Sequence, residues 1–215
     1  MGKSFLQTGI DKSVKYIGII MEKHDASIYP KYELPEGFSF ARYQPGFDKQ
    51  WALLNYEVDH TETLEAAEKI FREEFLEYDF EALKEKMVFA IDEKNNNLAG
   101  VGAVWDGDMF GEVQQRLHWI AVSSKYQNKG IAKAIISKLF DIYNNLGYNG
   151  YIYLTSQTWS YKALNIYTQF GFKPYMGEQP ENWKKDLDGQ SFEEKNAEAW
   201  KIINGKLKEY NNKNS

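Results

Sequence analysis

One short run of residues has a composition suited to anion binding. It reads Gln127-Asn128-Lys129-Gly130-Ile131-Ala132, and it follows an apolar run and opens a segment of helical periodicity. A loop with little side-chain bulk at the start of a helix directs several backbone N–H groups, and the positive end of the helix dipole, toward one point. We therefore expect this loop to bind an anion.

The segments on either side of the loop must position it. The run Leu117–Val122 has the character of a strand, and the residues after the loop are apolar at spacings that keep one helical face buried. These residues are Ile131, Ala134, Ile135, Leu139, Ile142 and Tyr143. Gly147 is suited to a left-handed C-cap, so we expect the helix to end there.

The loop lacks the glycine patterns of a P-loop and of a dinucleotide-binding fingerprint. It does match [QR]-x-x-G-x-[GA], and the run from Ser160 to Phe172 matches [NS]-x-x-A-x-x-x-Y-x-x-x-G-F with serine at its first position. A strand-like run, Gly150–Thr155, lies between the two motifs. Through these motifs, in this order, the chain resembles the GNAT superfamily of N-acetyltransferases over about residues 37–176.

The resemblance implies an α+β fold with a mixed, mostly antiparallel sheet, flanking helices, and fourth and fifth strands that splay apart to admit acetyl-CoA. It implies that main-chain N–H groups of the loop hold the pyrophosphate, with added charge from lysines, and that the fourth strand serves the pantetheine arm and the oxyanion. The cofactor-binding residues would be Ile120, Ala121, Val122, Gln127, Asn128, Lys129, Gly130, Ile131, Ala132, Lys133, Ser160, Ala163 and Tyr167. Ser160 can also cap the helix that follows it.

The resemblance also suggests which groups move protons. Tyr167 matches the tyrosine that acts as general acid in the family, although a core tyrosine would fit the same helix face. Glutamate on or before the fourth strand often serves as base, and here Glu112 is nearest. His118 is the other candidate, since an imidazole titrates near neutrality, but a buried, hydrogen-bonded histidine is as good an explanation. Strand alternation without a bulge would place Trp119 on the opposite face, in the core.

Composition limits the remaining possibilities. The 215 residues are 43% hydrophobic, which is enough for one sizeable core. Cysteine is absent and the three histidines are scattered, so we expect direct acetyl transfer and no metal. The net charge of -5 argues against nucleic acid as the main partner. Without a long apolar segment, we expect a soluble, cytoplasmic protein that does not enter a membrane.

Three parts are expected along the chain: an N-terminal arm (1–36), the GNAT domain (37–176) and a C-terminal extension (177–215). Hydrophobic patterning predicts strands at 14–21, 38–43, 87–92, 98–105, 112–122 and 150–155, and helices at 48–58, 61–78 and 191–210. The last helix opens with a capping box, Ser191 to Glu194. It could cover the acceptor cleft, dock on its own sheet, which we favour, or meet a second subunit in a homodimer.

The function that these observations favour is acetyl-CoA-dependent acetylation of a primary amine, on a small molecule or a peptide. Residues 57–85 hold eleven acidic and three basic side chains, which could attract a cationic amine or form only a solvated helix face. Trp51, Tyr56, Trp105 and Trp159 could favour a flat or apolar acceptor. Two alternatives remain: a GNAT-like module that senses acyl-CoA or a metabolite without turnover, and a partner-binding protein that has lost the cofactor.

Overall fold

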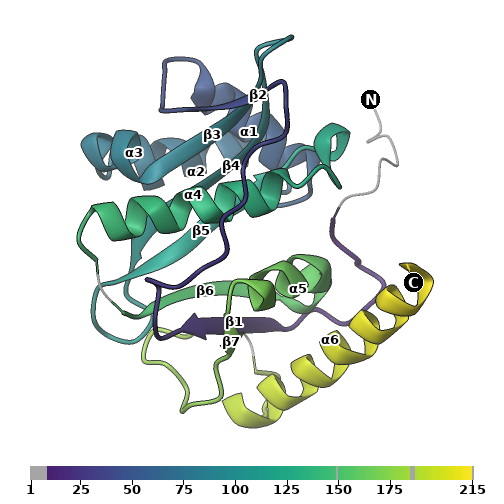
Figure 1. The fold of residues 1–215 in the computed structure, drawn as a ribbon. Coiled ribbons are helices and arrows are strands. Elements are labelled where there is room, and N and C mark those ends of the chain that lie inside the picture. The colour runs from purple at the N-terminus through teal and green to yellow at the C-terminus, as the bar shows by residue number, and fades with distance from the viewer. Residues whose placement is uncertain (1–8, 149, 185–186, 215) are drawn as a thin grey trace. The chain divides into compact units, whose positions relative to one another are not determined.

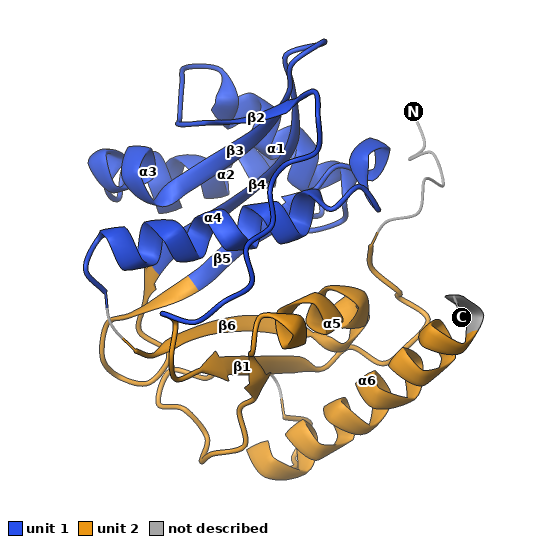
Figure 2. Cartoon of the chain, in the orientation of Figure 1, with its two compact units in different colours: residues 1–8, 27–105, 117–149 blue, residues 9–26, 106–116, 150–215 orange. Residues whose placement is uncertain are grey.

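The computed structural model describes residues 9–148, 150–184 and 187–214. Within these residues the chain forms two compact units (Figure 2). The first unit contains residues 27–105 and 117–148, and the second contains residues 9–26, 106–116 and 150–214. Two strands are shared, because the last two residues of β4 (Asn97–Gly107) and the first three of β5 (Gln114–Val122) belong to the second unit.

The first unit is built on antiparallel strands and helices (Figure 1). In chain order its elements are β2 (Phe38–Ala41), α1 (Phe47–Glu57), α2 (Leu64–Phe71), the π-helix η1 (Arg72–Leu76), α3 (Phe80–Lys86), β3 (Met87–Asp92), β4 (Asn97–Gly107), β5, the 3-10 turn η2 (Ser124–Tyr126) and α4 (Ile131–Asn145). The predicted hairpin is present as β3 and β4, with a register shift between Ala90 and Ile91.

The second unit contains β1 (Gly18–Lys23), β6 (Ile152–Gln157), η3 (Thr158–Ser160), α5 (Tyr161–Gln169), β7 (Lys173–Pro174) and α6 (Phe192–Asn214). Strand β1 is antiparallel to both β6 and β7. In the same unit, β5 pairs in parallel with β6, where Arg116 lies opposite Tyr153. The hydrogen-bonded order of strands is β2-β3-β4-β5-β6-β1-β7, which is the mixed, mostly antiparallel sheet that was predicted.

Alternating residues of β4 face two different layers of helices. One face packs on α1, α2 and η1, and the other packs on α4, which follows the loop. Val101, Ala103 and Trp105 belong to the buried cluster formed with α1, α2 and η1. The other face of β4 carries Gly100 and Gly102, where an added Cβ would lie 2.8 and 2.9 Å from side-chain atoms of Ile135 on α4. Because these two positions lack side chains, α4 packs closely on β4, and the loop that begins it is held against the sheet.

Several predicted elements have other bounds in the structure. The expected helix at 61–78 is α2 followed by η1, and the separate helix α3 was not predicted. The expected fourth strand starts at Gln114 instead of Glu112. The strand predicted at 14–21 is present as β1 at Gly18–Lys23, where it pairs with β6, and residues 1–8 of the expected arm lie outside the described residues.

The C-terminal helix docks on its own unit, as favoured. Its capping box forms, since Glu194 N donates to Ser191 Oγ (3.1 Å) and Ser191 N donates to Glu194 Oε2 (2.9 Å). Phe192 and Trp183 join Ile20 and Tyr153 in a buried cluster. The helix runs on to Asn214, past the predicted end at 210. Among the helices that the structure describes, none is both long and apolar enough to cross a membrane.

Candidate active site

The loop between β5 and α4 has the open helix start that the sequence predicted. Gly130 is the N-cap of α4 with φ 86°, and Asn128 also has a positive φ of 62°. No side chain caps this helix start, and its first turn contains no acidic residue. A Cβ at Gly130 would meet no atom within 4 Å, so the space in front of the helix is open. The first N–H groups of α4 can therefore receive an anion from outside the helix.

Polar and aromatic neighbours fix the shape of this loop. Gln127 Nε2 donates to the carbonyl oxygen of Val122 (3.2 Å), which ties the loop to the end of β5. Lys129 lies over the rings of Phe38 and Tyr126, at 5.7 and 5.6 Å from their centroids. Lys133 lies 5.0 Å over the ring of Tyr32. Both lysines are thus held beside the helix start, where their charge adds to that of the dipole.

Helix α4 is built as its sequence indicated. Every residue predicted for its buried face is buried. At the far end, Gly147 has φ 77°, its N–H donates to Asn144 O (3.0 Å), and Tyr148 N–H donates to Tyr143 O (3.2 Å). This pair of bonds is a Schellman motif, which requires the left-handed residue that glycine supplies.

The middle of β5 departs from the predicted alternation. Trp119 has φ 47°, a left-handed conformation that costs about 1–2 kcal/mol for a residue with a side chain. As a result, the side chains of His118 and Trp119 reach the same carboxylate. His118 Nε2 contacts Glu74 Oε1, and Trp119 Nε1 donates to Glu74 Oε2 at 2.9 Å. Trp119 thus does not lie opposite His118, as regular alternation would place it, and it packs against the core cluster as expected.

Glu74 is a site residue that the sequence did not single out. It lies on the π-helix η1, where Glu77 N donates to Arg72 O (2.8 Å). Neighbouring acids such as Glu65 and Glu68 are exposed. The Glu74 side chain is 28% exposed and faces β5. Eleven similar acids in the stretch gave no local signal that this one differs.

His60 is the other histidine of the first unit. Its Nδ1 lies 2.9 Å from Asn55 Oδ1, and Asn55 Nδ2 donates to Trp51 O (3.0 Å), which fixes the orientation of the amide. Burial lowers the pKa of His60 to about 4. A group with so low a pKa is a poor proton acceptor at neutral pH, which argues against His60 as the base.

The remaining predicted residues lie in the second unit. Tyr167 is buried on α5, with its ring 6.0 Å from that of Phe172, and burial raises the pKa of its hydroxyl. Ser160 is at the N-cap of α5 but makes no capping bond, because its Oγ accepts from Gln157 Nε2 (2.8 Å). The expected cap is therefore absent at this residue. Ala163 is half-buried on α5, and Glu112 is exposed ahead of β5.

Three of the four aromatic residues proposed for an acceptor cleft pack elsewhere. Trp51 and Trp105 are buried in the core cluster of the first unit. Trp159 donates from Nε1 to Val14 O (2.8 Å) and packs on Tyr16 at 4.9 Å. Core and tethering roles thus account for these three side chains, and they give no support to a flat acceptor.

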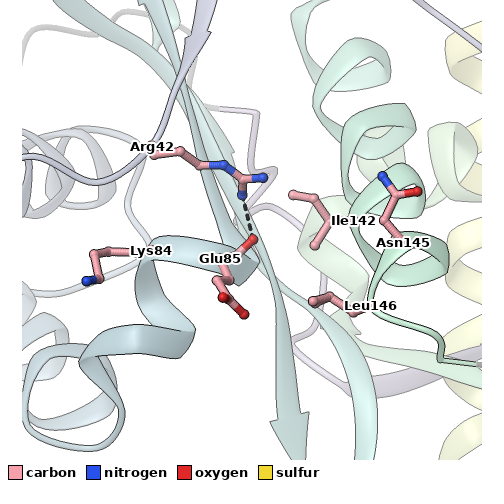
Figure 3. A pocket seen from close by; sticks show the side chains of 6 residues that line it. All are labelled: Arg42, Lys84, Glu85, Ile142, Asn145 and Leu146. Atoms are coloured by element: carbon pink, nitrogen blue, oxygen red, sulfur yellow. Dashed lines mark hydrogen bonds between the residues drawn. The ribbon is translucent and has the colours of Figure 1, made fainter.

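A pocket of about 190 Å³ lies at the other end of α4 from the loop (Figure 3). Arg42 donates there to the carbonyl oxygen of Glu85, in the last turn of α3. This bond satisfies a carbonyl group that the helix leaves open. The pocket contains none of the predicted site residues; its lining is Arg42, Lys84, Glu85, Ile142, Asn145 and Leu146.

Comparisons with known structures find the same fold. An N-acetyltransferase from Sphaerobacter thermophilus matches with 17% identity and a TM-score of 0.56, over 74% of this chain and 49% of its own. A GNAT-family acetyltransferase from Colwellia psychrerythraea matches with 10% identity and a TM-score of 0.55, over 75% and 54%. A Trypanosoma brucei acetyltransferase matches with 17% identity and a TM-score of 0.50, over 70% and 99%. The chain therefore spans about half the length of the first two.

The family comparison extends this likeness to the sequence. No curated protein matches the chain. The model of the acetyltransferase (GNAT) family matches residues 51–172, which is more than half of the chain and includes β5, the loop, α4 and the run that ends at Phe172. The chain belongs to the GNAT family of acetyltransferases.

Proposed function

We propose that this protein is an acetyl-CoA-dependent N-acetyltransferase that moves the acetyl group directly to a primary amine in a ternary complex. One observation carries the proposal beyond family membership: the start of α4 is uncapped, free of acidic residues in its first turn and flanked by Lys129 and Lys133. These features fit a diphosphate, which needs N–H donors and positive charge. The main-chain N–H groups of 127–132 would hold it.

The reaction needs a proton acceptor, a proton donor and a partner for the oxyanion. The attacking amine nitrogen forms a bond to the thioester carbonyl carbon, the C–S bond breaks, and one proton leaves the nitrogen while one reaches the sulfur. His118 is the proposed acceptor. Tyr167 is the proposed donor, because it stands at the tyrosine position of the second motif and its hydroxyl carries a proton. Backbone N–H at Ala121 or Val122 is the proposed oxyanion partner.

The amine is proposed to be a primary amine on a small molecule or a peptide. The exposed acids Glu65 and Glu68 of α2 would favour a cationic acceptor at low ionic strength. A panel that pairs each diamine with a monoamine of equal length tests this preference. Equal rates for both members of each pair at low salt would contradict it.

The test combines calorimetry with coenzyme A and release of free thiol from acetyl-CoA in the presence of the amine panel. We expect binding, thiol release with at least one amine, and an acetylated product by mass spectrometry. Tyr167→Phe should slow the reaction by about 10²-fold or more with unchanged coenzyme binding, as loss of a general acid does. Binding without thiol release from any amine would favour the sensor instead, and absence of binding would overturn the proposal.

A further inference from the structure

Glu74 is placed by two irregular backbone segments that meet at its carboxylate. The π-helix η1 carries Glu74 from one side. Single π-helical turns are rare in proteins, but those that occur are often found at functional sites. On the other side, the left-handed Trp119 turns two consecutive side chains of β5 toward η1. A regular strand would not produce this meeting, because neighbouring side chains of a strand point to opposite faces.

The bonding at this carboxylate favours one tautomer of the imidazole. The indole N–H of Trp119 can only donate, so it favours the ionised form of Glu74, which can only accept. With the carboxylate ionised, the contact between Nε2 of His118 and Oε1 is a hydrogen bond only when Nε2 carries the hydrogen. In the neutral ring the lone pair therefore lies on Nδ1.

We propose that Glu74 is the positioning residue of this transferase: it holds His118 in the Nε2–H tautomer, so that Nδ1 accepts the proton of the attacking amine. This inference rests on the proposed function. When Nδ1 takes the proton, the ring becomes cationic, and the Glu74 carboxylate beside Nε2 stabilises that charge. Trp119 keeps the carboxylate oriented through the second oxygen.

The test uses Glu74→Gln, which keeps the size of the side chain. The amide oxygen can accept from only one of the two N–H donors, while the amide NH₂ faces the other. We expect kcat to fall about 10- to 100-fold, as when an orienting partner is lost, with the KM for acetyl-CoA unchanged. Glu74→Asp, which restores the charge, should recover part of the loss.

The matched control is Glu73→Gln, on the same π-helix. Glu73 is 52% exposed and lies 3.7 Å from Arg72 and 3.9 Å from Lys69, as weak surface pairs do. This variant should retain the wild-type kcat. A fall equal to that of Glu74→Gln would assign the effect to the charge or folding of η1, and would overturn the inference.

Two further measurements separate positioning from a purely structural role. In ¹⁵N-histidine NMR, with His118→Gln to identify the signals, the wild-type His118 should be the Nε2–H tautomer and Glu74→Gln should shift it toward Nδ1–H. Adding Glu74→Gln to His118→Gln should cause no further loss of kcat. Suppose that the wild-type protein turns over. An unchanged His118 tautomer in Glu74→Gln, or losses of kcat that add in the double variant, would then overturn this inference alone. A wild-type protein that releases no thiol would overturn the proposed function with it.

Discussion

Helices α1 and α4 of the first unit have N-termini of similar backbone geometry but different charge. Each has a left-handed glycine at its N-cap, Gly46 with φ 96° and Gly130 with φ 86°, and neither has a side-chain cap. In α1, Asp48 lies in the first turn and its Oδ1 accepts from Gly46 N (3.0 Å). The corresponding second position of α4 is Ala132. One start therefore carries its own anion, and the other leaves that place open.

The comparison shows that a glycine-initiated helix is not by itself an anion site. What distinguishes α4 is the missing carboxylate together with the lysines that lie beside its start. The same chain thus supplies an internal control for each feature of the proposed coenzyme site. The following experiments test whether this difference has the consequences that we assign to it.

The largest effect is expected from giving α4 the acid of α1. Ala132→Asp should weaken coenzyme A binding about 100-fold or more, since a like charge a few ångströms from the diphosphate costs several kcal/mol at protein surfaces. Helix stability should not fall, because an acid in the first turn is favourable. Calorimetry gives the binding constant and thermal unfolding the stability. Ala132→Asn is the uncharged control, and equal losses for both variants would indicate a steric effect.

A smaller effect is expected from the two N-cap glycines. Gly46→Ala and Gly130→Ala should each destabilise the protein by about 1–2 kcal/mol, because both glycines have positive φ. The space around each added Cβ is open, so no steric clash adds to this cost. Only Gly130→Ala should also weaken coenzyme binding, by about 10-fold, as the Cβ enters the space in front of the N–H groups. Denaturant titration and calorimetry separate the two quantities. Unchanged binding in Gly130→Ala would place the diphosphate elsewhere.

The lysines should contribute less than the backbone. Lys129→Gln and Lys133→Gln should each weaken binding about 2- to 5-fold at low salt, the size expected for an exposed charge near a helix start. The loss should shrink as salt rises. Lys49→Gln, in the first turn of α1, serves as the control and should leave the binding constant unchanged at every salt concentration.

The smallest effect on binding is expected at α6, whose start is closed by its own capping box. Ser191→Ala removes the bond from Glu194 N to Oγ and should cost about 1 kcal/mol of stability. The coenzyme binding constant should not change. A loss of binding there, larger than for Lys129→Gln, would show that the open start of α4 is not what holds the coenzyme.

Much of the fold was predictable because it depends on short sequence patterns, such as helix caps and strand alternation. The turn chemistry of Gly130 and Gly147 fixes both ends of α4, and the capping box fixes the start of α6. The alternation of β3 and β4 gave the hairpin. The short helix α3 was not predicted. Its Asp79 cap bonds Ala82 N at 2.9 Å, so a local signal was present but lay inside an acidic stretch that reads as one longer helix.

The candidate site was predictable only in part. The loop and His118 came from motifs and residue types. The role of the Glu74 carboxylate was not predicted. Glu74 lies 44 residues from His118 in the sequence, on a π-helix that no local sequence pattern predicts.

The sequence by itself determined the family, the strand-loop-helix that could receive a diphosphate, and the helix ends, because glycine conformations and capping bonds depend on neighbouring residues. Only the tertiary structure decided that Trp119 is left-handed and that the chain makes a π-turn at Arg72–Leu76. Neither conformation is favoured locally. Each is held by contacts between segments far apart in the chain, such as the indole bond to Glu74 and the packing of Trp119 on Trp51 at 5.0 Å.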